Sequence, residues 1–240
     1  MSMTLSIALR GDTARHPGNT LPTLRSAWRS GTDLVKVDVH LSRDDYPVLA
    51  DDRLVATPGA APRPVDEMSL AELAAARQDV ENRVPTLMEV LAEFRAQDVP
   101  NLLVEAAEPR AALAADTLLR ERGLADQLVF TGPYQTLDAL RRRSGRARLL
   151  MPWEQSGPPP DDVVRALRPD FLGIHHSLLT RELITEMRGS GFAVAAWAAN
   201  EFTEMARLVE MGVDAVATER VGDLVPITRG NREEPQVEPA

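Results

Sequence analysis

Hydrophobic residues alternate with polar and charged ones along Leu34–Leu41. A period of two is typical of a β-strand, because successive side chains point to opposite faces of a sheet. One face of this strand is aliphatic, whereas the other carries Lys36, Asp38 and His40 in a row. Buried charges are costly unless they are paired or serve a site. The pattern therefore indicates either a strand that ends at a functional rim or an antiparallel hairpin with one wet face.

Strand-like and helix-like patterns alternate along most of the chain. The predicted strands begin at Leu5, Leu34, Asn101, Gln127, Arg148, Phe171, Phe192 and Ala215. A helical pattern follows each of them, and capping-box spacings such as Ser69 with Glu72 mark helix starts. Eight such units in one chain predict a single (β/α)₈ TIM barrel. The alternative is a doubly wound open sheet, but no glycine-rich turn follows the first strand.

Two stretches fall outside this rhythm. Residues 53–64 are rich in proline, glycine and alanine, which predicts a loop. Residues 229–240 are polar, and we expect them to form a disordered tail after one barrel domain at residues 1–228.

A barrel places its functional site at the carboxyl ends of the strands, which defines a ring of candidate residues. These are Arg10, Asp38, His40, Glu105, Thr131, Trp153, His175 and Trp197.

The amino-acid composition limits the kinds of ligand and partner that the protein can bind. The chain has 240 residues and no cysteine, which excludes disulfides and thiolate metal sites. No signal peptide or long apolar stretch is visible, so we expect a cytoplasmic protein without an integral membrane segment. The net charge of −9 argues against nucleic acid but allows an anionic small ligand in a local positive pocket, and a homo-oligomer is left open. Lys36 is the only lysine of the chain.

Short motifs occur along the chain in the order and spacing of one known family. Residues 9–11 (Leu-Arg-Gly) resemble its His-Arg-Gly motif, residues 17–21 (Pro-Gly-Asn-Thr-Leu) its Pro-Glu-Asn-Thr-Leu motif, and residues 35–39 its Glu-x-Asp-Val strand. The further matches lie at residues 47–52, 84–87, 104–105, 177–183, 197–200 and 212–218. On these motifs the chain resembles the glycerophosphodiester phosphodiesterase family over nearly its whole length.

The resemblance implies a definite chemistry. In that family, carboxylates hold a divalent cation that grips a phosphodiester, and two histidines act as general acid and base while glycerol 3-phosphate is released. This sequence has Leu9 at the first histidine position and Asp51 at the second. Both acid/base histidines of the family are therefore replaced.

The metal-ligand positions have changed as well. Gly18 and Lys36 stand where the family has metal-binding glutamates, whereas Asp38 and Glu105 are kept. Further replacements are Ala107 for a lysine and Glu219 for an aspartate, and Arg10 and Trp197 are retained. Because the losses are concentrated in the site, they suggest a changed function.

We expect the Lys36 ammonium to take the cation's place between Asp38 and Glu105. These two carboxylates would hold Mg²⁺ or Ca²⁺ only if the family site is retained, and we expect no metal and no other cofactor. The expected ligand-binding residues are Arg10, Lys36, Asp38, Glu105, Trp153 and Trp197.

The candidate catalytic residues are Arg10, His40 and His175. His16 and His176 are further candidates for a substitute acid or base. For each histidine the plainer alternative is a hydrogen-bonded rim or loop residue.

Three functions remain open. The first is a pseudoenzyme-like barrel that binds a small phosphorylated molecule or phosphodiester, or runs altered chemistry at its mouth. The second is an active phosphoric diester hydrolase of lipid or glycerophosphodiester metabolism with a rearranged site. The third is a metal-independent lyase, cyclase or isomerase.

Overall fold

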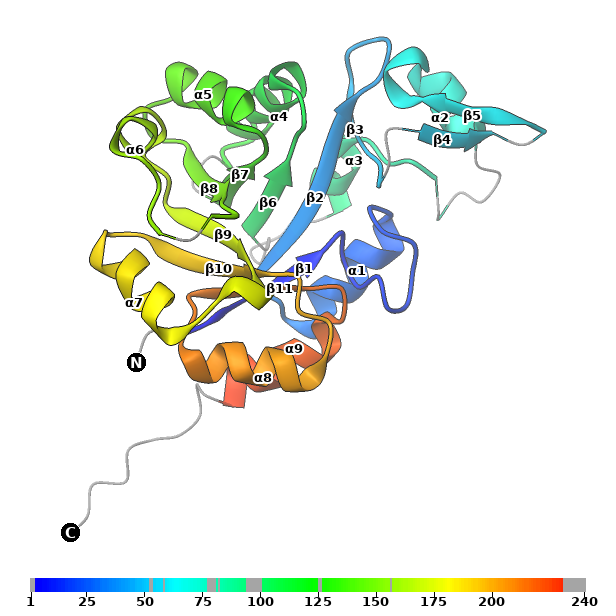
Figure 1. Ribbon diagram of the computed structural model, residues 1–240. Coiled ribbons are helices and arrows are strands. Elements are labelled where there is room, and N and C mark those ends of the chain that lie inside the picture. Colours follow the sequence, from blue (N-terminus) through cyan, green and yellow to red (C-terminus); the bar gives the residue numbers. More distant parts are fainter. Residues whose placement is uncertain are drawn as a thin grey trace.

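Eight parallel strands close into a barrel in the computed structural model (Figure 1), which describes residues 3–51, 54–57, 59–76, 81, 83–93, 101–124, 127–155 and 157–230. Around the barrel the strands follow one another in chain order, and the last pairs with the first. They are β1 (Leu5–Leu9), β2 (Leu34–Leu41), β6 (Asn101–Glu105), β7 (Leu128–Thr131), β8 (Arg148–Pro152), β9 (Phe171–His175), β10 (Ala193–Trp197) and β11 (Ala215–Thr218).

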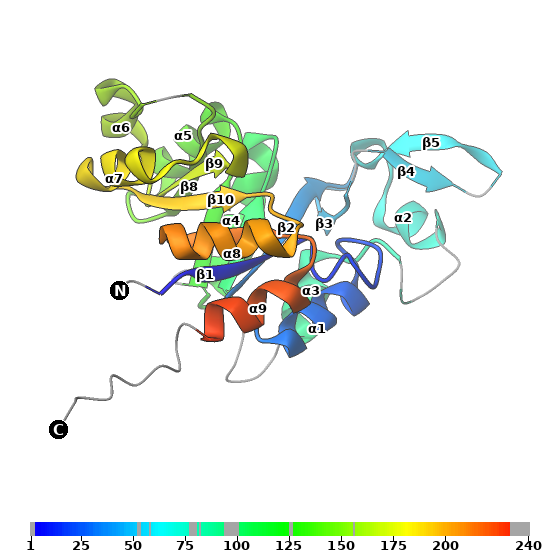
Figure 2. The same ribbon diagram turned by 60° about the horizontal axis from the view of Figure 1, so that its bottom comes forward.

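Helices surround the barrel on its outside (Figures 1 and 2). The α-helices are α1 (Leu21–Ser30), α2 (Leu70–Ala76), α3 (Leu87–Glu93), α4 (Pro109–Glu121), α5 (Tyr134–Arg143), α6 (Asp161–Leu167), α7 (Arg181–Gly189), α8 (Phe202–Met211) and α9 (Val221–Gly230). Short 3₁₀ turns lie at η1 (Val65–Glu67) and η3 (His176–Leu178). The predicted (β/α)₈ barrel is confirmed.

The two faces of β2 pack into different environments. Val35, Val37 and Val39 belong to the large core between the strands and the surrounding helices. A smaller cluster fills the barrel interior and consists of Ile7, Leu34, Leu103, Val129, Leu150, Ala195, Ala215 and Ala217. Lys36 and Asp38 therefore point to the inner side of the barrel, because strand side chains alternate.

β2 also forms an antiparallel pair beyond the barrel. Its last residues pair with β3 (Pro47–Leu49), while its first part pairs in parallel with β1 and β6. The first part of β2 is therefore a barrel strand and its last part belongs to an antiparallel hairpin, so each of the two structures predicted for this stretch is present in one part of it.

The loop predicted at residues 53–64 is in part a hairpin. β4 (Leu54–Thr57) pairs antiparallel with β5 (Ala60–Pro64). Proline is tolerated here because a two-stranded ribbon has free edges that require no donor. Val55 packs with Val65, Met68 and Leu73 in a small core of its own, separate from the two barrel cores.

At the carboxyl end, α9 continues to Gly230, beyond the predicted domain boundary at residue 228. The rest of the predicted tail lies outside the described residues. Among the helices that are described, none is both long and apolar enough to cross a lipid bilayer.

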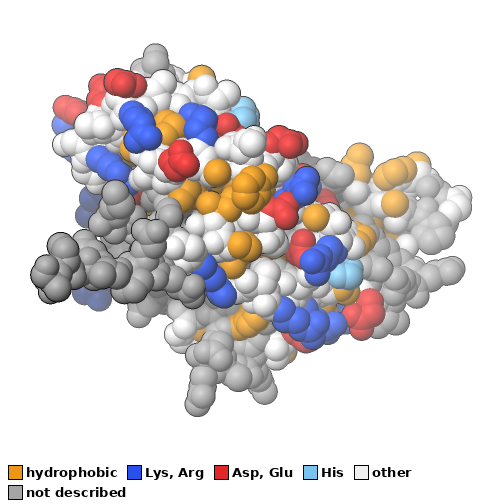
Figure 3. All heavy atoms as spheres, turned by 90° about the horizontal axis from the view of Figure 1, so that it is seen from below, with side chains coloured by type: hydrophobic (Ala, Val, Ile, Leu, Met, Phe, Trp, Pro, Cys, Tyr) orange, Lys and Arg blue, Asp and Glu red, His pale blue; other side chains and the backbone are white. Residues whose placement is uncertain are grey.

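The face viewed from below carries hydrophobic side chains near its middle, bordered by interspersed basic and acidic side chains (Figure 3). Large hydrophobic side chains that are exposed on the molecule include Trp197 at the end of β10 and Phe202 at the start of α8. Trp197 stands at the mouth of the barrel, where the candidate site lies.

Candidate functional site

Adjacent strands bring together Lys36, Asp38 and Glu105. Asp38 on β2 lies opposite Glu105 on β6 in the parallel register, so both carboxylates leave their strands at the same level. The Lys36 ammonium lies between them, paired with Asp38 and 2.5 Å from Oε2 of Glu105. One cation thus bridges the two carboxylates, as the sequence predicted.

The Lys36 ammonium is charged although it is largely buried, with 15% of its side chain exposed. Burial acts to lower its pKa, but the charges of Asp38 and Glu105 outweigh that effect, and the net result is a raised pKa. A positive charge is therefore fixed inside the barrel mouth at neutral pH.

Asn19 holds two carboxylates of the site in place. Its side-chain amide donates to Oδ2 of Asp38 at 2.8 Å and to Oδ1 of Asp51 at 2.7 Å, and its Oδ1 accepts from the backbone N–H of Asp38 at 3.0 Å. Asn19 is buried and has a positive φ of 53°, a conformation that asparagine tolerates better than most residues. Asn19 lies inside a matched motif, but it was not one of the predicted site residues.

Arg10 and Glu219 form a second ion pair at the mouth. Nη2 of Arg10 donates to Oε1 of Glu219, and Nη1 of Arg10 lies 3.9 Å from Oδ2 of Asp51. Asn200 orients the carboxylate: its amide donates to Glu219 at 3.3 Å, and its Oδ1 accepts from the Glu219 backbone N–H at 3.0 Å. Asn200 was not predicted as a site residue. It lies in the matched motif at residues 197–200, which could have identified it.

These ion pairs define a mouth cluster of six charged side chains, namely Arg10, Lys36, Asp38, Asp51, Glu105 and Glu219. Four carboxylates face two cations. Asp38 is buried, whereas the side chains of Glu105 and Glu219 are 45% and 40% exposed. The exposed pair can therefore swing away from the cations more easily than Asp38.

The donor set does not have the form of a divalent cation site. Within the described ranges, no three histidine or acidic side chains are grouped so that they could hold a metal ion. The space between Asp38 and Glu105 is filled by the ammonium of Lys36. The family's cation therefore does not fit this arrangement of residues.

Gly18 leaves the space that the carboxylate of Asp51 fills. A Cβ atom added to Gly18 would lie 2.7 Å from both carboxylate oxygens of Asp51. Since the resemblance places a glutamate at Gly18, the two changed positions are sterically coupled.

We expect Gly18→Ala to lower the free energy of unfolding by about 1 kcal/mol, because the new methyl group makes the Asp51 carboxylate turn aside and give up its hydrogen bond from Asn19. In a protein that already carries Asp51→Ala, we expect Gly18→Ala to leave the free energy of unfolding almost unchanged. Urea unfolding of the four proteins of this cycle measures the coupling. An equal cost in both backgrounds would show that Asp51 does not occupy this space.

The mouth opens into a cavity of about 730 Å³. Arg10, Lys36, Glu105 and the two predicted tryptophans all contribute to its lining, together with aliphatic residues from the far side of the barrel. Nε1 of Trp153 donates to the carbonyl of Gly157 at 2.8 Å, which fixes the indole at the rim. This mouth cavity is large enough for a small organic ligand.

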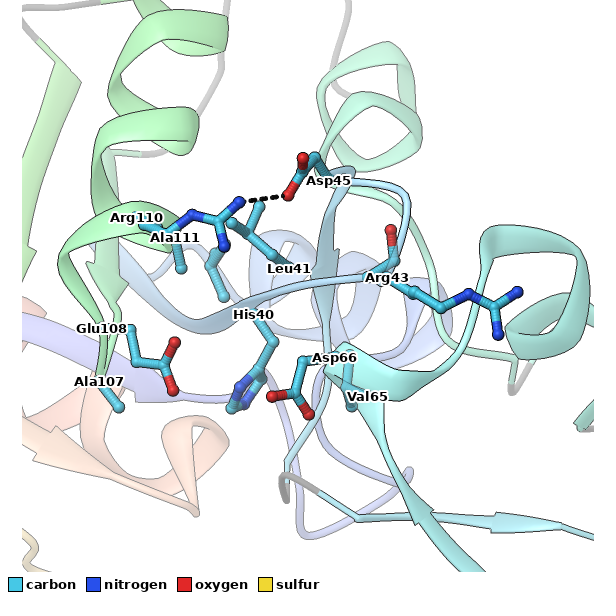
Figure 4. A pocket seen from close by; sticks show the side chains of 12 residues that line it. His40, Leu41, Arg43, Asp45, Val65, Asp66, Ala107, Glu108, Arg110 and Ala111 are labelled. Carbon is cyan, nitrogen blue, oxygen red and sulfur yellow. Dashed lines mark hydrogen bonds and ion pairs between the residues drawn. The ribbon is translucent and has the colours of Figure 1, made fainter.

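His40 lies outside the mouth cavity. It lines a separate depression of about 300 Å³, where its ring points between the carboxylates of Asp66 and Glu108 (Figure 4). Arg110 and Asp45 close one side of this depression with a 2.8 Å ion pair (Figure 4). The position follows from the end of β2 that leaves the barrel to pair with β3.

The other three histidines do not line the mouth cavity either. Nδ1 of His175 lies 2.8 Å from Oγ of Ser177, and its ring meets the Trp197 ring edge-on at 5.7 Å between centroids. His176 pairs with Glu204, whose pKa is lowered to about 2, chiefly by its hydrogen bond with Arg207.

His16 is exposed in a cleft between α1 and α9. The catalytic roles considered for the four histidines stay predictions, and His175 is the one in contact with a residue of the mouth cavity.

Comparisons with known proteins agree with this architecture. Residues 10–223 match the model of the glycerophosphoryl diester phosphodiesterase family. A glycerophosphodiester phosphodiesterase of Caldanaerobacter subterraneus is 21% identical, over 94% of this chain and 98% of its own. One from Arabidopsis thaliana is 26% identical, over 87% of this chain and 68% of its own.

Solved structures of similar fold come from several organisms. An Oleispira antarctica phosphodiesterase, solved in complex with the product sn-glycerol-3-phosphate, has a TM-score of 0.77 at 22% identity, covering 95% of this chain and 97% of its own. A glycerophosphodiester phosphodiesterase of Parabacteroides distasonis has a TM-score of 0.81 at 18% identity, covering 97% and 99%.

Proposed function

Because the chain belongs to the glycerophosphoryl diester phosphodiesterase family, we propose that its mouth binds a small phosphorylated molecule without a divalent cation. Arg10 and Lys36 supply the positive charge. The observation that carries the proposal is the Lys36 ammonium between Asp38 and Glu105. The glycerol 3-phosphate complex of the Oleispira antarctica phosphodiesterase supports the class of ligand.

A phosphate must compete with carboxylates for these two cations. Glu105 and Glu219 are the replaceable partners, since the side chains of both are exposed by 40% or more and their carboxylates can turn to water. Asp38 and Asp51 stay in place because Asn19 donates to both. The phosphate then receives charge-assisted hydrogen bonds from a guanidinium and an ammonium, which are stronger than neutral ones.

Hydrolysis by the two-histidine, metal-assisted route is not part of this proposal. The resemblance assigns the family's histidine positions to Leu9 and Asp51 and one of its cation-ligand positions to Lys36, whose ammonium lies between Asp38 and Glu105. Phosphoryl transfer without a metal or a positioned acid and base loses the groups that stabilise charge and move protons. The protein is therefore proposed to bind its ligand and release it unchanged.

We expect glycerol 3-phosphate to bind in the presence of EDTA, and Arg10→Gln or Lys36→Met to weaken it about 10- to 100-fold. A hydrogen bond to a charged group contributes roughly 1.5–3 kcal/mol. Glu105→Gln should bind as tightly as the wild type or more tightly, because a competing carboxylate is gone. Isothermal titration calorimetry measures all four proteins.

Arg43→Met is the matched control, since Arg43 pairs with Glu72 away from the mouth cavity. If EDTA abolished binding and Glu105→Gln weakened it, the site would hold a cation. Hydrolysis of glycerophosphodiesters that is lost on adding EDTA would favour the alternative of an active phosphoric diester hydrolase.

A further inference from the structure

The lining of the mouth cavity changes from charged to apolar around the barrel. Lys36 and Glu105 come from the neighbouring strands β2 and β6, and Arg10 directly follows the end of the adjacent strand β1. The strands β8, β9, β10 and β11 on the other side contribute uncharged residues, namely Leu150, Met151, Pro152, Gly173, Ala195, Ala196, Trp197 and Ala217. Glu154, exposed at the rim just after β8, is the charged lining residue on that side within the part of the chain that the structure describes.

Small residues hollow out the apolar side. Ala195 lies opposite Gly173 in the register of β9 and β10, and Ala217 lies opposite Ile7 in that of β11 and β1. A Cβ atom on Gly173 would lie 2.7 Å from Cδ2 of Leu150, so the leucine packs directly on the glycine. Larger side chains in place of Ala195 and Ala217 would extend into the cavity, so the two alanines leave room for an apolar group of a ligand.

Thr131 stands where the two sides meet. It lies opposite Glu105 in the register of β6 and β7, and it is only 6% exposed. Among the hydrogen bonds of the described residues, none involves its hydroxyl group, although Thr131 lines the cavity. The hydroxyl group is not one of the buried polar atoms that lack a partner, so it is accessible from the cavity, and an oxygen of a ligand there can form a hydrogen bond with it.

We infer that the mouth cavity takes a phosphate ester of an aliphatic alcohol. This inference rests on the proposed function, which places the phosphate at Arg10 and Lys36. The Thr131 hydroxyl donates to the ester oxygen, and the hydrocarbon chain lies on the wall formed by β8 to β11. Trp197 and Trp153 cover the chain at the rim, where both indoles contribute to the lining.

The ligand is therefore an amphiphile with one anionic end. A polar alcohol such as glycerol would leave the apolar wall unused and its own hydroxyl groups without partners, since that wall offers few polar side chains. Each methylene group that leaves water for the wall should tighten binding about fourfold, which is 0.8 kcal/mol.

A homologous series tests the inference. Ethyl, butyl, hexyl and octyl phosphate are titrated into the full-length protein below their micelle concentrations, with octan-1-ol as the uncharged probe. We expect affinity to rise about fourfold per methylene up to a length at which the cavity is full. Trp197→Ala should weaken octyl phosphate about tenfold and leave ethyl phosphate unchanged.

Phe202→Ala is the matched control, because Phe202 is an exposed aromatic residue that does not line the cavity. It should bind the whole series like the wild type. A second variant, Val163→Phe, narrows the cavity from α6 and should shorten the length at which affinity stops rising. Val163→Phe provides an independent test of the cavity if Trp197→Ala does not fold.

The outcomes separate the two proposals. Equal affinity for ethyl and octyl phosphate would overturn the apolar site and leave the proposed function standing. Suppose that octan-1-ol binds as tightly as octyl phosphate, and that Arg10→Gln binds octyl phosphate as tightly as the wild type does. The apolar wall would then be supported, but the phosphate would not lie at Arg10, and this result would overturn the inferred ester. A rise with length that needs both the phosphate and Arg10 supports the inference.

Discussion

Lys36→Met is expected to lower the free energy of unfolding by about 3 kcal/mol. Breaking a buried ion pair by removing one partner typically costs about 3–5 kcal/mol, because the other charge stays buried and unpaired. Here Asp38 is the buried partner, at 8% exposure, whereas the more exposed Glu105 can turn to water. The lower end of the range therefore applies. Urea unfolding at neutral pH measures the loss.

The double variant Lys36→Met/Asp38→Asn is the control for this prediction. It removes the stranded charge while keeping a side chain of the same shape, so it should recover a large part of the lost stability. Lys36→Met with a loss below about 1 kcal/mol would mean that the ammonium is an ordinary exposed group.

The contribution of Lys36 also has a definite pH window. Its pKa is raised in the folded protein, so the stabilisation is fully present below the pKa of an unfolded lysine, about 10.4. It is lost as the pH rises from there through the higher folded value. The stability difference between wild type and Lys36→Met should therefore be constant near neutral pH and shrink in strong alkali.

Lys36→Glu is expected to acquire a divalent cation site. The substitution restores the residue type of the family and removes the ammonium that separates Asp38 from Glu105. Three carboxylates would then lie close together and repel one another, so the variant should be markedly less stable without a cation. Oxygen ligands from carboxylates suit Mg²⁺ and Ca²⁺. At about 100 times its dissociation constant, the cation should add roughly 2.7 kcal/mol.

Lys36→Gln separates metal binding from the mere loss of the lysine. It removes the ammonium but adds no carboxylate, so it should respond to Mg²⁺ or Ca²⁺ much less than Lys36→Glu. Equal responses of the two variants would mean that the residue at position 36 does not contribute a ligand.

The barrel was predictable because its signals are local and repeated. The alternation along β2 marked both the strand and its charged inner face, and eight repeats of strand and helix left few possible topologies. The hairpin of β4 and β5 was missed because its sequence is rich in proline and glycine, and its pairing depends on a small core that only tertiary structure assembles.

The site was predictable where a strand register carries it. Lys36, Asp38 and Glu105 lie on neighbouring strands, so their meeting follows from the barrel itself. His40 shares the alternation of Lys36 and Asp38 but lies in a different depression, because β2 leaves the barrel before it ends. A simple period of two cannot show where a strand changes its partner.

Contacts made through loops could not be read from the chain. Asn19 joins Asp38 to Asp51 across two loops and a strand end, and the fit of Asp51 against Gly18 depends on both loops at once. The resemblance identified these positions as changed, but their steric coupling is visible only in three dimensions.

The central claim is that the Lys36 ammonium stands in place of the family's divalent cation. Thermal unfolding of the wild type with and without millimolar Mg²⁺ or Ca²⁺, beside Lys36→Glu, tests it most directly. We predict an unchanged transition for the wild type and a clear rise for Lys36→Glu. A rise for the wild type would contradict the claim, because Asp38 and Glu105 would then hold a cation in spite of Lys36.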